Sequence, residues 1–446
     1  MKLPNLLLFV PLMFLPGEGL ALGFANGVKI GELTHDSVVI WTRLTKNALA
    51  DHQVEKWDPE TPHWQVPGQA GELRVSLIQP EEQMSLAQMP VLVDAGSDFC
   101  HQVRFTDLDP ATRYTVTILG TAGEETAEYV TSFRTAPLPS CEEAITFTVS
   151  TCQDFPRRDD KANGHKIYKS MLAEEPDFFV QTGDTLYYDK PDPFAKDLAT
   201  ARYKWNRIYA LPFLREFHKV IPSYWMHDDH DVLKDDCWPG QKYGDLTWDQ
   251  GLKIWSEQVP QSDKPYRTFR WGKHLQIWLP EGREYRSPNT MEDGPEKSIL
   301  GKKQWKWLEE TMKASDATFK LYVSATPVVG PDRKGKNDNH ANKGFRHEGK
   351  RLREFLSAIP GCFVINGDRH WQYHSIDPDT QLNEFGSGPA SNVHAGGFNR
   401  DLKEEWQPFL RIKGGYLSVE VDAKTAKVVH HDVDGMAVNE VVISAP

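Results

Sequence analysis

Cysteine is scarce in this sequence, and long apolar runs are absent. The five cysteines are far apart, and their odd number leaves at least one unpaired, so one or two disulfides are possible. The most apolar stretch, residues 6–15, is shorter than the ~20 residues that a membrane-spanning helix needs. No other segment is long and apolar enough, so we expect no transmembrane segment.

Positive charge is also in short supply. Lys and Arg number 51 against 63 Asp and Glu, which gives a formal net charge of -12. This balance argues against a partner nucleic acid bound through a basic surface, because contacts to phosphate backbones need Lys and Arg. Small anionic substrates are still compatible with it, since bound metal ions reverse the local charge.

Arginine is missing altogether from residues 1–21. Lys2, the apolar run 6–15 and the small residues of Gly19-Leu20-Ala21 together predict an export signal peptide over 1–21. An uncleaved anchor is disfavoured by the shortness of the run, and no Cys follows it to accept a lipid. We therefore expect an exported protein, periplasmic or extracellular.

Residues 22–136 predict an all-β sandwich, and the total of 446 residues favours two or three domains. Short alternating segments are separated by turn residues, as strands of a sandwich are. Residues 46–71 read as a long loop between strands. The segments 108–114 and 131–137 resemble the end of a fibronectin type III domain, in which Tyr114 would be the corner residue and the domain would end near 137.

From residue 144 onward, strand patterns alternate with amphipathic helix patterns, which predicts an α/β layered domain. The expected helices are 166–173, 196–217, 304–312 and 350–356. Residues 416–443 return to a β pattern, with Asp434-Gly435 as a turn.

Metal-binding residue types follow four apolar runs, each where a strand is expected to end. These are Cys152, Gly183-Asp184, the cluster His227 to Asp231, and Gly367-Asp368-Arg369-His370. Carboxylates and imidazoles bind hard and borderline cations, and ligand sites form at the carboxyl ends of parallel strands. The order of these segments predicts a metal site assembled from distant parts of the chain.

Five motifs in this order resemble the metallophosphatase superfamily and, within it, the alkaline phosphatases of the PhoD type. They are residues 150–153, 183–187, 228–231, 281–287 and 367–370. With the β module in front, the resemblance covers nearly all of residues 22–446. It implies that residues 137–446 form a metallophosphatase catalytic domain, with two mixed sheets flanked by helices.

The resemblance also implies a set of metal ligands. They are Cys152, Asp184, Tyr187, Asp229, Asp368 and His370. Asp184 would bridge two ions, the Cys152 thiolate and the Tyr187 phenolate would bind ferric iron (Fe3+), and Asp229 and Asp368 would bind calcium. Iron accounts for both anionic ligands, since a trivalent ion stabilises deprotonated sulfur and phenol oxygen.

Three catalytic residues are expected beside the metals. The resemblance implies that His230 contacts the phosphoryl group or protonates the leaving oxygen, with Asp228 and Asp231 supporting the ligands from behind. Arg283 and Arg286 are suited to clamping phosphate oxygens, although solvated surface charges are an equal alternative. His227 is expected to point away from His230, because side chains alternate along an extended segment. His374, His394, His430 and His431 lack motif context and are expected to be surface or structural residues.

The sequence departs from the superfamily pattern at three motifs. The first strand ends in Thr151-Cys152-Gln153 where relatives usually have Asp-x-His, residues 324–327 lack the usual His, and Asp368 replaces the first His of Gly-His-x-His. A standard dinuclear site would lack ligands here, which favours the PhoD type, with zinc or manganese as alternatives to iron and calcium. The missing arginine in residues 1–21 also excludes the twin-arginine signal common in the family.

The sequence therefore predicts a secreted phosphohydrolase acting on small phosphate esters, with a metal-activated hydroxide or bridging oxygen as the attacking group. One alternative is a phosphodiesterase for phospholipid or teichoic-acid-like diesters. Another is an inactive surface binding protein, in which Trp238, Trp248, Trp255, Trp305 and Trp307 would stack on sugars. The segment 331–347, rich in Gly, Lys, Asn and Asp, is expected to be a mobile loop near the site. The sequence does not determine the oligomeric state.

Overall fold

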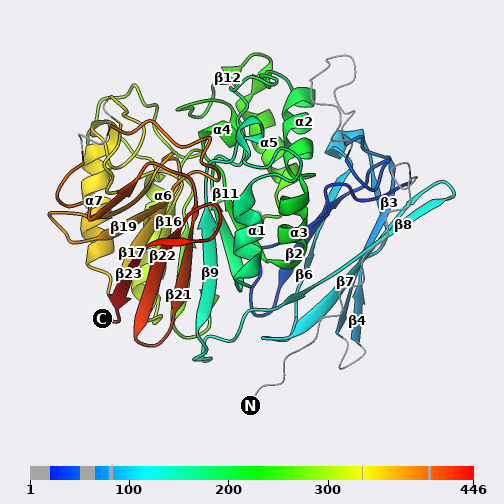
Figure 1. Ribbon diagram of the computed structural model, residues 1–446, viewed down its shortest axis with the longest axis horizontal. Coiled ribbons are helices and arrows are strands. Elements are labelled where there is room, and N and C mark those ends of the chain that lie inside the picture. Colours follow the sequence, from blue (N-terminus) through cyan, green and yellow to red (C-terminus); the bar gives the residue numbers. More distant parts are fainter. Residues whose placement is uncertain (1–20, 51–65, 80–83, 263, 334, 400–402) are drawn as a thin grey trace.

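The computed structural model describes residues 21–50, 66–79, 84–262, 264–333, 335–399 and 403–446. The predicted signal peptide and most of the predicted loop 46–71 lie outside these ranges. The described part of the chain forms two large mixed sheets that pack face to face, with helices on their outer faces and a β-rich N-terminal region (Figure 1).

The first large sheet has nine strands in the order β23-β22-β21-β9-β10-β11-β1-β2-β6. Its central strands β9, β10 and β11 are parallel. Their bounds are β9 Ile145–Ser150, β10 Phe178–Thr182 and β11 Ser223–Met226. The flanking strands are β21 Tyr416–Val421, β22 Thr425–His431, β23 Ala437–Ser444, β1 Val28–Gly31, β2 Val38–Arg43 and β6 Cys100–Phe105.

The second large sheet has seven strands in the order β14-β15-β16-β17-β19-β18-β20. Strands β15, β16, β17 and β19 are parallel, and the other three run antiparallel to their neighbours. The bounds are β14 Arg267–Trp271, β15 Leu275–Leu279, β16 Phe319–Ser324, β17 Cys362–Asn366, β18 Gln372–Ile376, β19 Asn383–Ser387 and β20 Phe409–Arg411.

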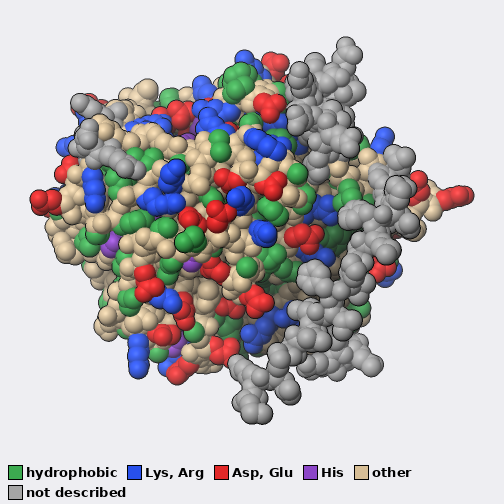
Figure 2. All heavy atoms as spheres, in the orientation of Figure 1, with side chains coloured by type: hydrophobic (Ala, Val, Ile, Leu, Met, Phe, Trp, Pro, Cys, Tyr) green, Lys and Arg blue, Asp and Glu red, His purple; other side chains and the backbone are tan. Residues whose placement is uncertain are grey.

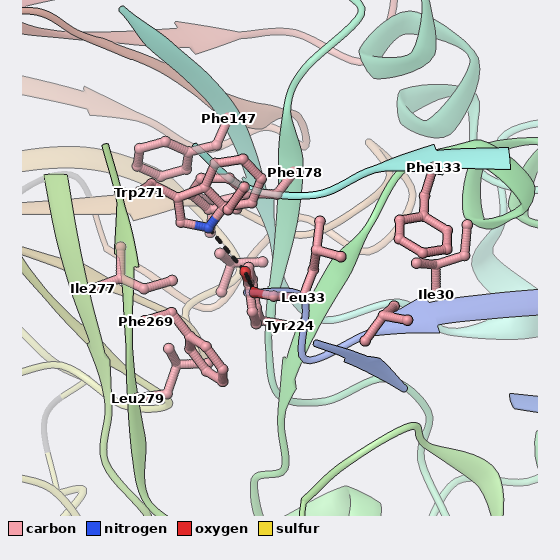
Figure 3. Packing of buried hydrophobic residues seen from close by; sticks show 14 of the residues in the cluster. Ile30, Leu33, Phe133, Phe147, Phe178, Tyr224, Phe269, Trp271, Ile277 and Leu279 are labelled. Atoms are coloured by element: carbon pink, nitrogen blue, oxygen red, sulfur yellow. Dashed lines mark hydrogen bonds between the residues drawn. The ribbon is translucent and has the colours of Figure 1, made fainter. Parts of the chain in front are cut away.

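The core between the two sheets is made of large apolar side chains, several of them aromatic. Phe178 of β10 stacks on Phe147 of β9 with ring centroids 4.7 Å apart, and on Trp271 of β14 at the same distance (Figure 3). The Trp271 indole donates a hydrogen bond of 2.8 Å to the Tyr224 hydroxyl. Phe179, the next residue of β10, points to the opposite face and packs under the helices.

Helices cover the outer faces of both large sheets, so these elements form four layers. The nine-stranded sheet is covered by α1 Lys166–Ala173, α2 Leu198–Ile208, α3 Pro212–Val220 and α5 Trp248–Gln258. The seven-stranded sheet is covered by α6 Gly301–Ala314 and α7 Arg346–Ser357. Shorter elements are α4 Asp229–Val232, η2 Ala95–Ser97, η3 Phe155–Arg157, η4 Lys343–Phe345, and the hairpin of β12 Lys242–Tyr243 and β13 Leu246–Thr247.

The predicted helices are confirmed with one correction. Residues 196–217, expected as one helix, form α2 and α3, because Pro212 begins a new helix at its first turn. The helix α5 was not predicted. Its residues Trp248 and Trp255, together with Trp305 of α6, are buried in the core, so these three indoles do not form a sugar-stacking surface.

The N-terminal region is rich in strands, as predicted. Strands β3, β4, β5, β7 and β8 form a separate five-stranded sheet, whereas β1, β2 and β6 extend the nine-stranded sheet. Their bounds are β3 Gly71–Gln79, β4 Met84–Ala87, β5 Val91–Val93, β7 Arg113–Ala122 and β8 Glu125–Arg134. The Tyr114 hydroxyl accepts a hydrogen bond of 2.9 Å from the Asp109 backbone, the contact expected of a corner tyrosine. The fibronectin-like assignment and the domain boundaries stay predictions.

The C-terminal β pattern is confirmed as β21, β22 and β23, with Asp434-Gly435 between the last two. On the face drawn in Figure 2, acidic and basic side chains of the described residues are interspersed. No helix in the described ranges is both long and apolar enough to cross a bilayer.

Candidate metal centre

The four strand ends singled out in the sequence meet at one rim of the molecule. Cys152, Asp184 and the segment 227–231 follow the adjacent parallel strands β9, β10 and β11, and Asp368 follows β17 of the other sheet. Potential ligand atoms from all four strand ends lie within 4.8 Å of one another in overlapping groups of three. The predicted convergence is therefore confirmed.

The backbone at this rim takes an unusual conformation. Cys152, Asp184 and Asp368 all have left-handed φ angles, of 51°, 54° and 64°. Gly183 has a φ of 95°, and a Cβ atom there would lie 2.7 Å from the Cβ of Asp228. Left-handed non-glycine residues are uncommon and gather at functional sites, where the surrounding structure holds the strain.

The first group of potential ligands surrounds one carboxylate oxygen. Cys152 Sγ lies 3.3 Å from Asp184 Oδ2, and the Tyr187 hydroxyl donates a hydrogen bond of 3.0 Å to the same oxygen. The Tyr187 oxygen is also 3.2 Å from His370 Nε2. Sulfur, phenol oxygen, carboxylate and imidazole thus face one point.

Two further groups share Asp184. One consists of Asp184, Asp228 and Asp368, and the other of Asp184, Asp229 and His230. Asp184 Oδ1 and Asp228 Oδ2 are buried oxygens with no hydrogen-bond partner among the described residues. Buried polar atoms without partners are rare, so these oxygens fit a site built for cations.

The rim crowds buried carboxylates together, and His230 and Arg283 offset only part of their charge. Burial raises the pKa of the Asp184 carboxyl well above its usual range, and repulsion from Asp229, Asp228 and Asp368 raises it further. Burial also raises the pKa of the Cys152 thiol, and the nearby carboxylates of Asp184 and Asp368 raise it further. A bound cation would reverse both shifts by stabilising the anions.

His230 is held by a carboxylate that the sequence motifs did not include. Its Nδ1 lies 2.7 Å from Asp189 Oδ1, while Nε2 lies 3.7 Å from Asp235 and 4.0 Å from Asp229. The ring is stacked at a tilt over Tyr187, with centroids 4.3 Å apart. His230 therefore belongs to the rim and presents Nε2 toward its carboxylates.

The two candidate arginines differ in position. Arg283 is buried and donates through Nε to Asp228 at 2.5 Å, with Asp229 at 3.7 Å and Asp338 at 3.6 Å. Arg286 is buried too, but it bonds the Asp338 backbone oxygen and lies over the Phe345 ring. Neither is a solvated surface charge, and of the two it is Arg283 that contacts the carboxylates of the rim.

The described part of segment 331–347 lies beside the candidate metal centre, as expected, and forms ion pairs with residues there. Asp332 forms an ion pair of 2.9 Å with Arg369, and Asp338 pairs with Arg283. Asp338 is 1% exposed, and the two residues after it are also buried. These ion pairs connect the described part of the segment to the rim, and its expected mobility stays a prediction.

His394 lies beside Cys152 and His370, a position that the sequence did not predict. It is buried, its Nδ1 lies 3.0 Å from the Cys152 carbonyl oxygen, and its ring centroid is 4.1 Å from that of His370. Nothing around it in the sequence marks it, because the loop that carries it reaches the site only through folding. His374 and His430 are buried and belong to none of the potential ligand groups among the described residues, as expected of structural residues.

The cysteines form no disulfide, and all five are described residues. Cys152 is fully buried at the rim and forms no disulfide, so its sulfur is available for the ligand role that the resemblance implies.

The two packed mixed sheets, with helices outside and carboxylates at their joined strand ends, define a metallophosphatase fold. A solved structure of PhoD has a TM-score of 0.75 to this chain at 19% identity, and covers 95% of this chain and 89% of its own. A purple acid phosphatase isolated from yellow lupin (Lupinus luteus) seeds has a TM-score of 0.68 at 12% identity, with coverage of 95% and 74%. These likenesses show the fold.

Sequence comparison identifies the family. The PhoD-like phosphatase family matches residues 147–428, more than half of the chain, and the PhoD-like phosphatase N-terminal domain matches residues 18–137. Alkaline phosphatase D of Bacillus subtilis (strain 168) is 22% identical over 447 residues, which cover 87% of this chain and 72% of that protein. The chain belongs to the PhoD-like phosphatase family, and it is a phosphatase.

Proposed function

We propose that the chain is an exported, metal-dependent phosphohydrolase that cleaves small phosphate esters. The proposed metal ligands are Cys152, Asp184, Tyr187, Asp229, Asp368 and His370. The observation that carries this proposal is the position of Asp184, which belongs to three potential ligand groups and has a buried oxygen that no described residue bonds. A carboxylate so placed is suited to bridge two ions.

The donor types suggest which ions these residues take. Cys152 and Tyr187 supply sulfur and phenol oxygen, which become anionic beside a trivalent ion such as iron (Fe3+). Asp229 and Asp368 supply carboxylates, which suit calcium. Zinc or manganese is the alternative. When bound, such ions activate water and neutralise charge on the phosphoryl oxygens.

Asp231 is not a proposed metal ligand, but its side chain holds the backbone of the rim through hydrogen bonds. Its Oδ2 accepts hydrogen bonds of 2.8 Å from the backbone of both Asp184 and Asp228, and Oδ1 accepts one of 2.8 Å from Thr185. One buried side chain therefore ties the loops after β10 and β11 together. This support fits the ordering role that carboxylates behind metal ligands have in other sites.

We assign leaving-group protonation to His230 and phosphate contact to Arg283. Asp189 fixes the Nδ1 side of His230, which leaves Nε2 to face the reacting group. Arg283 carries the fork of donors suited to phosphate oxygens and lies among the rim carboxylates. Arg286 is placed behind it, where it supports the segment at Asp338.

The test is turnover of p-nitrophenyl phosphate by the variants Asp184→Asn and Asp368→Asn. Each is expected to lower turnover by at least ~100-fold, because a metal ligand is lost. Asp379→Asn is the matched control, since Asp379 is an exposed aspartate outside the rim. Folded variants of Asp184 and Asp368 with the turnover of the control would refute the proposal.

The same assay with bis-p-nitrophenyl phosphate addresses the diester alternative. We expect the monoester to be the better substrate. A higher kcat/KM for the diester would instead place the chain among phosphodiesterases. Recovery of the mature protein outside the cytoplasm, with its N-terminus near residue 22, is the outcome expected of an exported chain.

A further inference from the structure

A second cluster of metal-binding side chains lies behind the loop that carries Arg283 and Arg286. It consists of His227, which follows β11, and of Glu281 and Glu284, which follow β15. None of the three belongs to the ligand groups of the candidate metal centre. Arg283 lies between the two sites, because its backbone bonds Glu281 and its side chain bonds Asp228.

The distances in this cluster are those of ligands around an ion. His227 Nε2 lies 3.5 Å from Glu281 Oε1 and 3.5 Å from Glu284 Oε1. A direct N–H···O hydrogen bond is usually about 2.7–3.2 Å long. Two ligands on a tetrahedral zinc ion, each about 2.0–2.2 Å from the metal, lie about 3.3–3.6 Å apart. Both measured separations fall in the second range.

The surroundings hold the donors in place. Both oxygens of Glu281 accept backbone hydrogen bonds of 2.6 Å, from Arg283 and Glu284. Gln304 of α6 bonds the Glu281 backbone on both sides, at 2.7 and 2.8 Å. The Trp255 ring packs edge-on against His227, with centroids 5.2 Å apart. Ligating carboxylates are normally fixed by such outer contacts.

The cluster is buried but open on one side. The side chains of His227 and Glu281 are 5% and 3% exposed, whereas that of Glu284 is 26% exposed. His227 Nδ1 is buried and has no hydrogen-bond partner among the described residues. In this buried setting His227 Nε2 faces two carboxylates, and the partly exposed Glu284 offers an ion a path from solvent.

We propose that His227, Glu281 and Glu284 bind one divalent ion of the zinc class. One imidazole and two carboxylates suit zinc, and two negative charges balance the ion. The ion would join the end of β11 to the loop 281–287, and so fix the backbone from which Arg283 reaches the rim. This site is structural, and it does not depend on the metals or the reaction of the proposed function.

The test compares the metal content of wild type, Glu284→Gln and Glu292→Gln. Each protein is dialysed with Co2+ or Zn2+, freed of loose ions, and measured by elemental analysis. Glu292 is an exposed glutamate outside the cluster, so its variant has the same change of charge. Wild type and Glu292→Gln should bind one ion more than Glu284→Gln. Equal metal content in the three proteins would overturn the proposal.

A second measurement separates an ion from a simple ion pair between His227 and the glutamates. Added Zn2+ should raise the melting temperature of wild type and Glu292→Gln in a dose-dependent way, because an ion that binds only the folded state stabilises it. Glu284→Gln should lack the part of this increase in melting temperature that comes from Zn2+ bound at His227, Glu281 and Glu284. If the three proteins respond alike, the cluster is an ion pair. Phosphatase turnover is measured separately, because it tests the proposed function and not the presence of the second ion.

Discussion

The N-terminal five-stranded sheet and the rim of the candidate metal centre differ in how far they bury polar side chains. Along β7, Tyr114, Val116 and Ile118 are buried, while Thr115 and Thr117 between them are partly exposed. At the rim, four aspartates at positions 184, 228, 229 and 231 are all buried. The sheet is stabilised by apolar burial, whereas the rim keeps charges out of water, which is unfavourable unless they are paired or bind cations.

The comparison teaches that the two regions should respond differently to mutation. Side chains of the rim should matter for turnover and little for stability, because their burial does not itself favour folding. Side chains of the sheet should matter for stability and little for turnover. Three predictions test this division, and a fourth concerns a buried histidine outside both regions.

The largest effect is expected for Cys152→Ser. Removing the thiol should lower turnover by at least ~100-fold and reduce bound iron, with little change in the melting temperature of the metal-free protein. Turnover and elemental content are measured together. Cys362→Ser is the control, because Cys362 lies at the start of β17, away from the rim. Equal iron content in both variants would contradict the assignment of Cys152.

A smaller effect is expected for Asp189→Asn. His230 would lose the carboxylate 2.7 Å from its Nδ1, and kcat should fall by about 10- to 100-fold. The loss should be greater for an alkyl phosphate than for p-nitrophenyl phosphate, because a poor leaving group needs the proton more. A loss of the same size for both substrates would mean that Asp189 does not act through His230 as the acid that protonates the leaving group.

In the N-terminal five-stranded sheet, Tyr114→Phe should destabilise the protein without lowering its turnover. The Asp109 backbone N–H would lose its hydrogen bond to the buried hydroxyl, which we expect to lower the free energy of unfolding by about 0.5–1.5 kcal/mol. Urea unfolding measures this change. A turnover that falls together with stability would break the division between the two regions.

The last prediction concerns His430 of β22, in the nine-stranded sheet. Burial lowers the pKa of this imidazole to about 3, so the unfolded chain takes up a proton below pH ~6.5 that the folded chain refuses. The stabilising contribution is thus complete above that pH and is lost as pH falls toward 3. His430→Gln should flatten the curve of unfolding free energy against pH by up to about 1.4 kcal/mol per pH unit. Superimposable slopes would show that His430 does not titrate in this way.

Much of the fold could be predicted because local patterns agree with it. The bounds of α1 coincide with its apolar spacing, and the rim residues Cys152, Asp184 and Asp368 follow strands that the sequence marks clearly. The ends of parallel strands meet at one edge of a sheet, so motifs far apart in the sequence could be predicted to form one site. The break at Pro212 is also readable in retrospect.

The rest of the site depends on loop closures that no local pattern encodes. His394 and Asp338 come from loops between elements, and they reach the rim through contacts with residues far away in sequence. Asp189 follows a recognised motif, but its partner His230 lies 41 positions later. Loop conformations of this kind are set by tertiary packing, which composition and periodicity do not report.

The continuity of the nine-stranded sheet bears on how such a chain can change over evolution. Strand β1 pairs with β11, Arg202 of α2 bonds Glu257 and the backbone near η2, and Lys204 of the same helix bonds the Tyr187 carbonyl oxygen. The N-terminal region therefore contacts α2, and α2 in turn contacts the candidate site at Tyr187. A recombination point near residue 137 would cut this support. The two regions are expected to be inherited as a pair, unlike β modules that are shuffled freely on linkers.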